Sequence, residues 1–127
     1  MKQAKVIDLF CGIGGLSHGF VKEGFNVVAG VDIDPTCKYA FEENNNAKYI
    51  EKSITEINVD TLGSYFKDTQ TKILVGCAPC QPFSSYTFKD KEKNNNEKWK
   101  LLYEFSRLVK ETEPDIISME NVSQLIN

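Results

Sequence analysis

The sequence has 127 residues, a net charge of −3 at pH 7, 41% hydrophobic residues and 26% charged residues. This composition is typical of one globular domain and excludes a disordered or collagen-like chain. No apolar run approaches the roughly 20 residues of a membrane span, and no signal-peptide core is present, so we expect a cytoplasmic protein with no membrane partner. Arginine occurs only at Arg107, and the excess of lysine with many asparagines is typical of an AT-rich bacterial genome.

Apolar runs alternate with segments of helical periodicity along the chain. Short apolar runs that end at turn residues indicate buried strands, and apolar residues three or four positions apart indicate one face of a helix. Asp34 before Pro35 predicts a helix start, because aspartate caps free N–H groups and proline fits the first helical position. The predicted elements are strand 5–10, helix 16–21, strand 26–31, helix 37–44, a short strand at 49–50, helix 59–66, strand 72–77, helix 101–109 and strand 115–119.

Residues 84–98 show no sustained apolar period, which predicts a long loop inside the domain. On both sides of this loop, strands and helices alternate strictly, and the strands are apolar throughout rather than at every second residue. This pattern indicates an α/β domain with a parallel sheet covered by helices on both faces.

A glycine-rich turn follows the first predicted strand and contains Gly12, Gly14 and Gly15. Glycines at a strand-to-helix turn let the backbone approach a ligand, and Asp32 at the end of the second strand suits a ribose hydroxyl pair. Ser17 stands where the dinucleotide fingerprint requires its third glycine. A nucleotide-containing cofactor is therefore predicted, and an NAD-dependent oxidoreductase is one alternative.

Two reactive side chains are predicted at the carboxyl edge of the sheet, where open α/β folds bind ligands. Cys80 follows the fourth strand, and Glu120 ends the fifth. Cys77 and Cys80 also form a C-x-x-C pair, which is typical of redox centres and of half a zinc site. The glycine turn argues against a thioredoxin-like fold, and no second ligand pair follows, so no metal is expected. Buried, unreactive thiols are expected for the other three cysteines, Cys11, Cys37 and Cys77.

Three separated motifs occur in a fixed order along the chain: Asp8-Leu9-Phe10-Cys11-Gly12-Ile13-Gly14-Gly15, then Pro79-Cys80-Gln81, then Glu120-Asn121-Val122. Together they closely resemble the DNA (cytosine-5) methyltransferase family. The resemblance covers nearly the whole chain. It implies a Rossmann-like S-adenosylmethionine-dependent methyltransferase fold, with strand order 3-2-1-4-5 and the C-terminal strands missing.

The resemblance also implies a cofactor site for S-adenosylmethionine and its product S-adenosylhomocysteine. The glycine turn would hold the methionine part, Asp32 the ribose, and Ile33 the adenine. Ser53 stands where the family often has an aspartate that accepts a hydrogen bond from the adenine amino group. The complete implied set is Asp8, Phe10, Cys11, Gly12, Gly14, Gly15, Leu16, Asp32, Ile33, Ser53, Ile54, Pro79 and Leu101.

The implied catalytic residues are Cys80, Glu120 and Asn121. Carbon 5 of cytosine is a poor nucleophile, and attack of the Cys80 thiolate on carbon 6 would activate it. Glu120 would act at ring nitrogen 3, and Asn121 would orient Glu120. The substrate would be double-stranded DNA with the target cytosine flipped out of the stack.

The family's later segments, including its target-recognition region, have no counterpart here, so residues 1–127 are interpreted as a partial catalytic domain. We expect the isolated chain to be at most weakly active and to require a C-terminal part, which a separate methyltransferase chain could supply. The fifth strand would leave an open sheet edge, through which self-association is expected. A non-catalytic cofactor-binding remnant is the other alternative.

Overall fold

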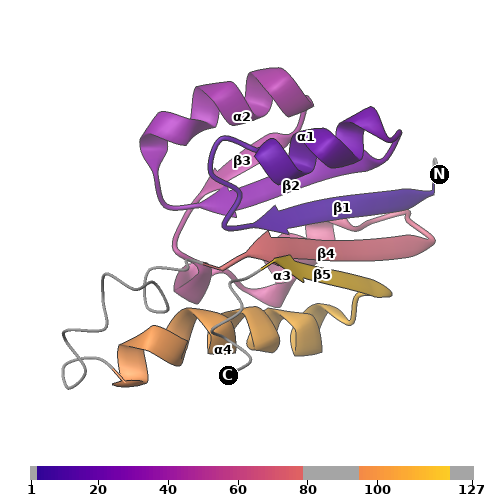
Figure 1. Cartoon of the computed structure of the whole chain (residues 1–127). Coiled ribbons are helices and arrows are strands. Elements are labelled where there is room, and N and C mark those ends of the chain that lie inside the picture. The colour runs from indigo at the N-terminus through magenta and orange to yellow at the C-terminus, as the bar shows by residue number, and fades with distance from the viewer. Residues whose placement is uncertain (1–2, 79–94, 121–127) are drawn as a thin grey trace.

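The computed structural model describes residues 3–78 and 95–120, with side chains from residue 99 onward in the second segment. Within these residues, five parallel strands form one sheet in the order β3-β2-β1-β4-β5, which confirms the predicted strand order (Figure 1). The strands are β1 (Ala4–Leu9), β2 (Asn26–Asp32), β3 (Lys48–Glu51), β4 (Thr71–Cys77) and β5 (Ile116–Glu120).

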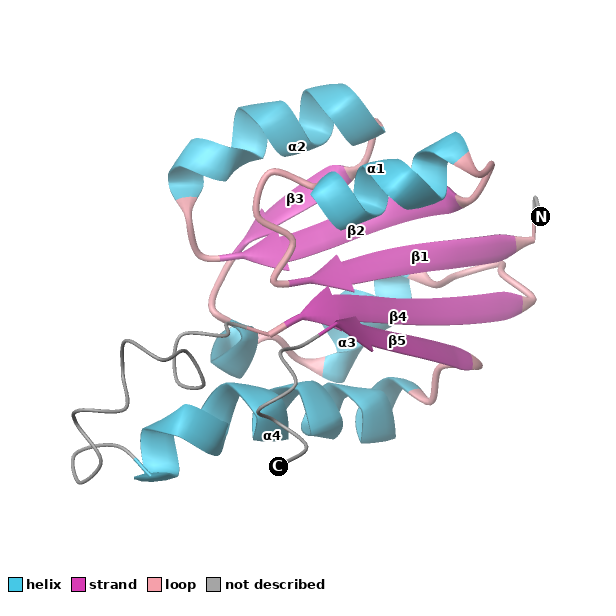
Figure 2. Cartoon of the chain, in the orientation of Figure 1, coloured by secondary structure: helices cyan, strands magenta, loops and turns pink. Residues whose placement is uncertain are grey.

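Helices cover both faces of the sheet, as the apolar strands predict (Figure 2). Helices α1 (Gly15–Lys22) and α2 (Lys38–Asn45) lie on one face, and α3 (Val59–Tyr65) and α4 (Asn95–Thr112) lie on the other. Two short 3-10 helices, η1 (Pro35–Cys37) and η2 (Ile54–Glu56), precede α2 and α3. Each sheet face has its own apolar core, one against α1 and α2 and one against η2, α3 and α4.

Several local predictions need correction. Asp34 does act as a cap, accepting from Thr36 N at 2.9 Å, but it caps η1 rather than α2 itself. The spacing of helix 37–44 predicts Asn44 on its inner face, but the buried amide of α2 is Asn45, and Asn44 is exposed. Helix α4 begins at Asn95, inside the predicted loop 84–98, because the polar residues of its first turn carry no apolar signal in the sequence. The rest of that loop, 84–94, lies outside the described residues.

Strand β5 differs from the other strands in its exposure. All five of its residues are exposed, and Ile116, Ile117 and Met119 are 40–48% exposed. The central strands β1 and β4 are instead almost wholly buried. Among the described residues β5 is one of the two outer strands, with β3 at the other edge, and the prediction of self-association through the β5 edge stays a prediction.

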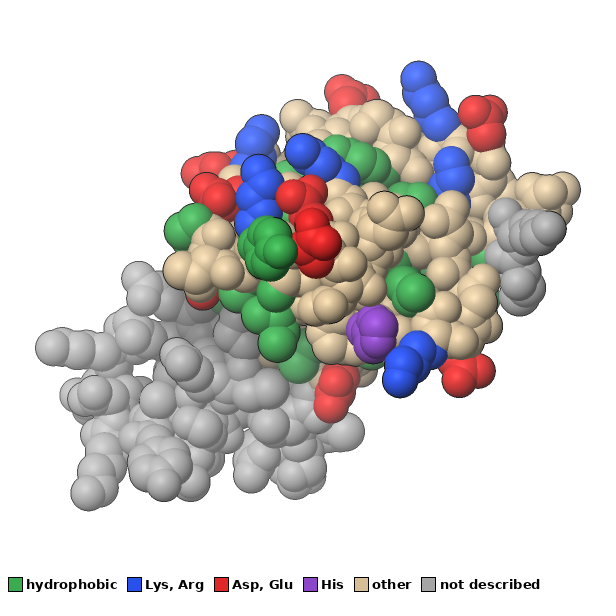
Figure 3. All heavy atoms as spheres, turned by 90° about the horizontal axis from the view of Figure 1, so that it is seen from above, with side chains coloured by type: hydrophobic (Ala, Val, Ile, Leu, Met, Phe, Trp, Pro, Cys, Tyr) green, Lys and Arg blue, Asp and Glu red, His purple; other side chains and the backbone are tan. Residues whose placement is uncertain are grey.

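The face that carries α1 and α2 shows acidic and basic side chains interspersed rather than gathered by sign (Figure 3). This mixture gives that face no concentrated positive potential for a phosphate backbone. Among the helices of the described segments, none combines the length and the apolar character that a bilayer span requires.

Candidate functional site

The carboxyl ends of four strands bring the candidate site residues to one edge of the sheet. Phe10 follows β1, Asp32 ends β2, Cys77 ends β4 and Glu120 ends β5. Cys77 and Glu120 are register partners in the β4–β5 pair. Glu120 is exposed, and it lies beside the point from which the chain continues to Cys80. Glu120 thus lies at the carboxyl edge of the sheet beside the end of β4, and the predicted convergence with Cys80 stays a prediction.

Three predicted residues, Pro79, Cys80 and Asn121, lie outside the described residues. Their predicted roles stay predictions.

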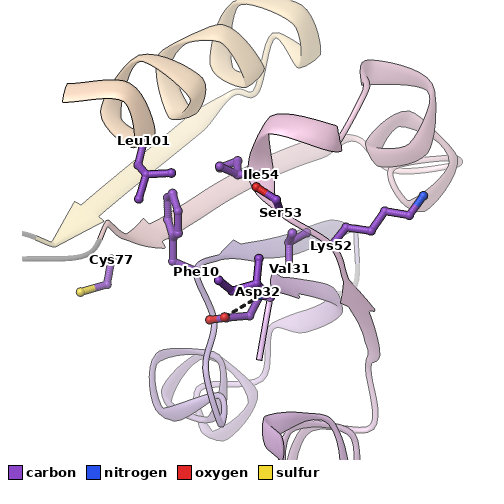
Figure 4. A pocket seen from close by; sticks show the side chains of 9 residues that line it. Phe10, Val31, Asp32, Lys52, Ser53, Ile54, Cys77 and Leu101 are labelled. Atoms are coloured by element: carbon purple, nitrogen blue, oxygen red, sulfur yellow. Dashed lines mark hydrogen bonds between the residues drawn. The ribbon is translucent and has the colours of Figure 1, made fainter. Parts of the chain in front are cut away.

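A pocket of about 250 Å³ opens at this sheet edge (Figure 4). Its walls are largely apolar and come from β2, β4, η2, α4 and the turns that follow β1 and β3, with Asp32 as the acidic group. The lining residues are Phe10, Val31, Asp32, Ile33, Lys52, Ser53, Ile54, Cys77 and Leu101. Six of the predicted cofactor residues thus meet in one pocket: Phe10, Asp32, Ile33, Ser53, Ile54 and Leu101.

Asp32 is fixed in place by backbone N–H groups. Its Oδ2 accepts from Gly12 N at 2.8 Å, and its Oδ1 accepts from Ile33 N at 2.7 Å and Asp34 N at 3.3 Å. These bonds tie the glycine turn to the end of β2, and Oδ2, which accepts one of the three bonds, retains a lone pair for a further donor. A carboxylate held this way is suited to accept hydrogen bonds from a vicinal diol such as a ribose.

Phe10 leaves β1 with φ 57°, a left-handed conformation that is uncommon for a large side chain. This turn directs its ring into the pocket, between Asp32 and Leu101 (Figure 4). Such backbone conformations cost of order 1–3 kcal/mol and concentrate at ligand sites.

The glycines of the turn have two different roles. Gly14 has φ 90°, and a Cβ there would lie 2.4 Å from Asn45 Nδ2 and 2.7 Å from the Phe41 ring, so it is required for packing against α2. Gly12 also has positive φ, at 54°, but a Cβ there would meet nothing within 4 Å. Gly12 and Gly15 therefore face open space, and Gly14 does not.

Asp8 is 1% exposed and is not among the residues that line this pocket, and its predicted place in the cofactor site stays a prediction. Its Oδ2 accepts from Ser17 Oγ at 2.6 Å, which joins β1 to the first turn of α1. Burial raises the pKa of Asp8 to about 6, against the lowering effect of its hydrogen bonds from Ser17. Asp8 thus supports the glycine turn from behind.

Cys11 and Leu16 likewise lie outside the pocket lining. Cys11 is buried against α2, and burial, followed by the charge of Asp8, raises the pKa of its thiol. It is therefore a neutral, unreactive thiol at physiological pH. Leu16 packs into the core under α1 and α2.

The wall opposite the glycine turn consists of Ser53, Ile54 and Leu101. Ser53 caps η2: its Oγ accepts from Thr55 N at 3.3 Å and lies 2.9 Å from Thr55 Oγ1. Lys52 N donates to Asp32 O at 3.0 Å, which holds this segment against the end of β2. The Lys52 side chain points away from the other lining residues (Figure 4).

Sequence reasoning missed Val31, Lys52 and Cys77 as lining residues. Cys77 was expected to be a buried hydrophobe, but it is half-buried and lines the pocket. Its position as the last residue of β4, at the ligand-binding edge, was the available signal. Among residues 3–78 and 99–120, no group of three or more His, Cys, Asp or Glu side chains is arranged to hold a metal ion.

Comparison with known proteins agrees with this geometry. The sequence model of the family described as C-5 cytosine-specific DNA methylase matches residues 4–127. The chain belongs to this family. It is 59% identical over 120 residues to the Type II methylase M.HgiDII of Herpetosiphon aurantiacus, a match that covers 94% of this chain and 33% of that protein. It is 34% identical to the Type II methyltransferase M1.HphI of Haemophilus parahaemolyticus, over 94% of this chain and 32% of that protein.

These curated relatives are much longer than the matched region, and the chain spans about a third of their length. Solved structures show the same fold and the same partial coverage. A prophage-encoded DNA modification methyltransferase of E. coli superposes with a TM-score of 0.76 at 28% identity, over 98% of this chain and 33% of that one. DNMT2 of Spodoptera frugiperda, at 22% identity and a TM-score of 0.68, shares the fold over 98% of this chain and 37% of that one.

Proposed function

We propose that this chain provides the cofactor pocket and the catalytic motifs of an enzyme that transfers a methyl group from S-adenosylmethionine to carbon 5 of cytosine in double-stranded DNA. The observation that carries the proposal is the pocket beside the braced carboxylate of Asp32, in a chain of the C-5 cytosine-specific DNA methylase family. Residues 1–127 would form part of a catalytic domain, and the target-recognition region and remaining strands would come from further sequence or a separate chain.

The pocket fits the parts of S-adenosylmethionine. Asp32 offers carboxylate oxygens to the ribose hydroxyls, and Phe10, Ile33, Ile54 and Leu101 offer apolar surfaces to a flat base. The open backbone at Gly12 and Gly15 leaves room for the methionine part. When bound, the cofactor supplies an electrophilic methyl group on a sulfonium.

The catalytic residues act on the cytosine ring. The Cys80 thiolate forms a bond to carbon 6, and the π electrons of the 5,6 double bond become available at carbon 5 for methylation. Loss of the carbon 5 proton and cleavage of the sulfur–carbon 6 bond then release 5-methylcytosine and restore Cys80. Glu120 shares a proton with ring nitrogen 3, and Asn121 orients Glu120. The ring must leave the base stack to reach these groups, at a cost of a few kcal/mol.

The two alternatives have unequal support. Nothing in the family match favours NAD, so an NAD-dependent oxidoreductase is the weaker one. A non-catalytic remnant would keep the pocket and lose covalent chemistry, and this difference can be measured.

Covalent trapping tests the proposal. A DNA duplex containing 5-fluorocytosine, incubated with the chain and S-adenosylmethionine, should give a slow 1:1 protein–DNA adduct, because fluorine cannot leave carbon 5 as a cation. Cys80→Ala should abolish the adduct. Cys77→Ala, which removes the neighbouring thiol at the end of β4, should retain it. An adduct that persists in Cys80→Ala would exclude the assigned nucleophile. Cofactor binding without any adduct, even when the C-terminal part is supplied as a separate chain, would indicate a remnant.

A further inference from the structure

Arg107, the only arginine of the chain, connects α4 to η2 through its side chain. Its Nη2 donates to the backbone carbonyls of Ile54 at 3.1 Å and Ile57 at 2.8 Å. Its other nitrogens bind carboxylates of its own helix, Nε to Glu104 at 2.6 Å and Nη1 to Glu111 at 3.0 Å.

This arrangement uses the rigid geometry of a guanidinium group. The two glutamates bind Nε and Nη1 and so fix the plane of the guanidinium, which leaves Nη2 to point at η2. Hydrogen bonds from a charged donor are stronger than neutral ones. The accepting carbonyls, at Ile54 and Ile57, belong to the two ends of the same short turn. Arg107 therefore fixes the distance between η2 and α4.

The turn and the helix are two parts of one pocket wall. Ile54 comes from η2, and Leu101 comes from α4, six residues or about 9 Å before Arg107 along the helix axis. Both residues line the pocket, and Ser53 precedes Ile54 directly. The spacing between Leu101 and the Ser53–Ile54 segment thus depends on the position that Arg107 gives to η2.

We propose that Arg107 is a positioning residue that sets the width of the adenine end of the cofactor pocket and the placement of the Ser53 hydroxyl. It touches no ligand and acts through the carbonyls of Ile54 and Ile57. This inference rests on the proposed function, because it takes the pocket to bind an adenosine-containing cofactor.

The fold has other supports in this region, so Arg107 is not its main anchor. Ile54 and Ile57 are buried in the core with Leu62 and Leu108, and Ser53 and Asn58 cap the turns that begin there. The side chain of Arg107 is itself 32% exposed. Loss of Arg107 should loosen the pocket wall while leaving the domain folded.

The test compares Arg107→Met, Arg107→Lys and a control, Lys110→Met, which removes an exposed cation from the same helix. Calorimetric titration gives the affinity for S-adenosylhomocysteine and for S-inosylhomocysteine, which differ only at the base edge. Hydrogen exchange at the amides of Glu56 and Ile57, which bond to Ser53 O and Ile54 O, reports the order of η2. Thermal unfolding of each variant checks the fold.

Arg107→Met should bind S-adenosylhomocysteine about tenfold more weakly, from the loss of charged hydrogen bonds that hold the wall. It should also lose the preference for adenine over hypoxanthine and exchange the two amides faster. Arg107→Lys should recover part of the affinity and selectivity, and Lys110→Met should match the parent chain.

The outcomes separate the two proposals. Failure of the parent chain to bind S-adenosylhomocysteine would overturn the proposed function, and the role of Arg107 with it. If the parent chain binds but Arg107→Met binds equally well, only the role of Arg107 is refuted. An equal loss for both ligands, in proportion to a lower unfolding temperature, would make Arg107 merely structural and would also refute the positioning role.

Discussion

The two walls of the pocket are built in different ways. The glycine-turn wall is held from behind by buried polar contacts and by close packing, with Asp8 bonded to Ser17 and Gly14 against Asn45. The opposite wall, at Ser53 and Ile54, is held by a surface cap and by the partly exposed Arg107. The first wall therefore depends on buried contacts throughout, whereas the second combines the buried side chain of Ile54 with a turn that is held by surface hydrogen bonds.

This difference predicts different responses to mutation. A change behind the glycine turn disturbs the packing of β1, α1 and α2, so the free energy of unfolding should fall. A change on the Ser53 wall should alter ligand affinity or selectivity while stability stays nearly constant. The walls can be tested separately for these two effects.

The largest effect is expected at Gly14. Gly14→Ala would bring a Cβ against Asn45 and Phe41 at a position with φ 90°, so the free energy of unfolding should fall by about 4 kcal/mol. Urea unfolding followed by circular dichroism measures this change. Gly15→Ala is the matched control, because its Cβ meets nothing within 4 Å, and it should change stability by less than about 0.5 kcal/mol. Equal effects in both variants would contradict the assigned packing role of Gly14.

The next effect is a pH dependence from Asp8. The pKa of Asp8 is about 6 in the folded state and near 3.8 in the unfolded chain, so the folded state holds the proton more tightly than the unfolded chain does. The contribution of Asp8 to stability is thus present below pH 4 and is lost as the pH rises to 6, by roughly 3 kcal/mol.

Urea unfolding across pH 4 to 7 should show this loss as the difference between the parent chain and Asp8→Asn. The asparagine side chain of the variant keeps an oxygen that can accept a hydrogen bond from Ser17, and it does not titrate. Parallel stability profiles for the two proteins would rule out a titrating Asp8.

Asp32 belongs to the first wall but faces the ligand. Asp32→Asn replaces one acceptor oxygen with an NH₂ group, which would face a backbone N–H donor and could not accept from a ribose hydroxyl. The affinity for S-adenosylhomocysteine should therefore fall about 30-fold. Calorimetry measures this loss. Asp34→Asn, a change at the neighbouring cap of η1, should keep the affinity within about twofold. A similar loss in both variants would point to a general effect of charge.

The smallest effect is expected on the second wall. Ser53→Asp keeps a cap for Thr55 N and adds a carboxylate acceptor, so S-adenosylhomocysteine should bind about fivefold more tightly with little change in stability. S-inosylhomocysteine, which lacks the amino group, should gain nothing. Tighter binding of both ligands, or of neither, would show that residue 53 does not contact the amino edge of the adenine base.

How far the sequence predicts the molecule depends on the range of the interactions involved. The strands, the glycine turn and Asp32 follow from local patterns, because glycines, caps and apolar runs act over a few residues, whereas the strand order is implied by the family resemblance. The role of Gly14 depends on Asn45, and the role of Arg107 depends on carbonyls 50 and 53 residues away. No local pattern contains such contacts, and the same limit applies to the buried hydrogen bond between Asp8 and Ser17.

The exposure of β5 also required the structure. Its apolar sequence predicts a buried strand, and the register with β4 confirms its place in the sheet. Both of its faces carry exposed apolar side chains in this chain, which spans about a third of its curated relatives. Exposed apolar strand surface of this kind is typical of a contact region.

The central claim is that the pocket beside Asp32 binds S-adenosylmethionine. Calorimetric titration of the folded 127-residue chain with S-adenosylmethionine, S-adenosylhomocysteine and NAD tests it most directly. The account predicts 1:1 binding of both adenosyl ligands, no binding of NAD, and binding about 30-fold weaker in Asp32→Asn. Binding of NAD, or of none of the three by a folded chain, would contradict it.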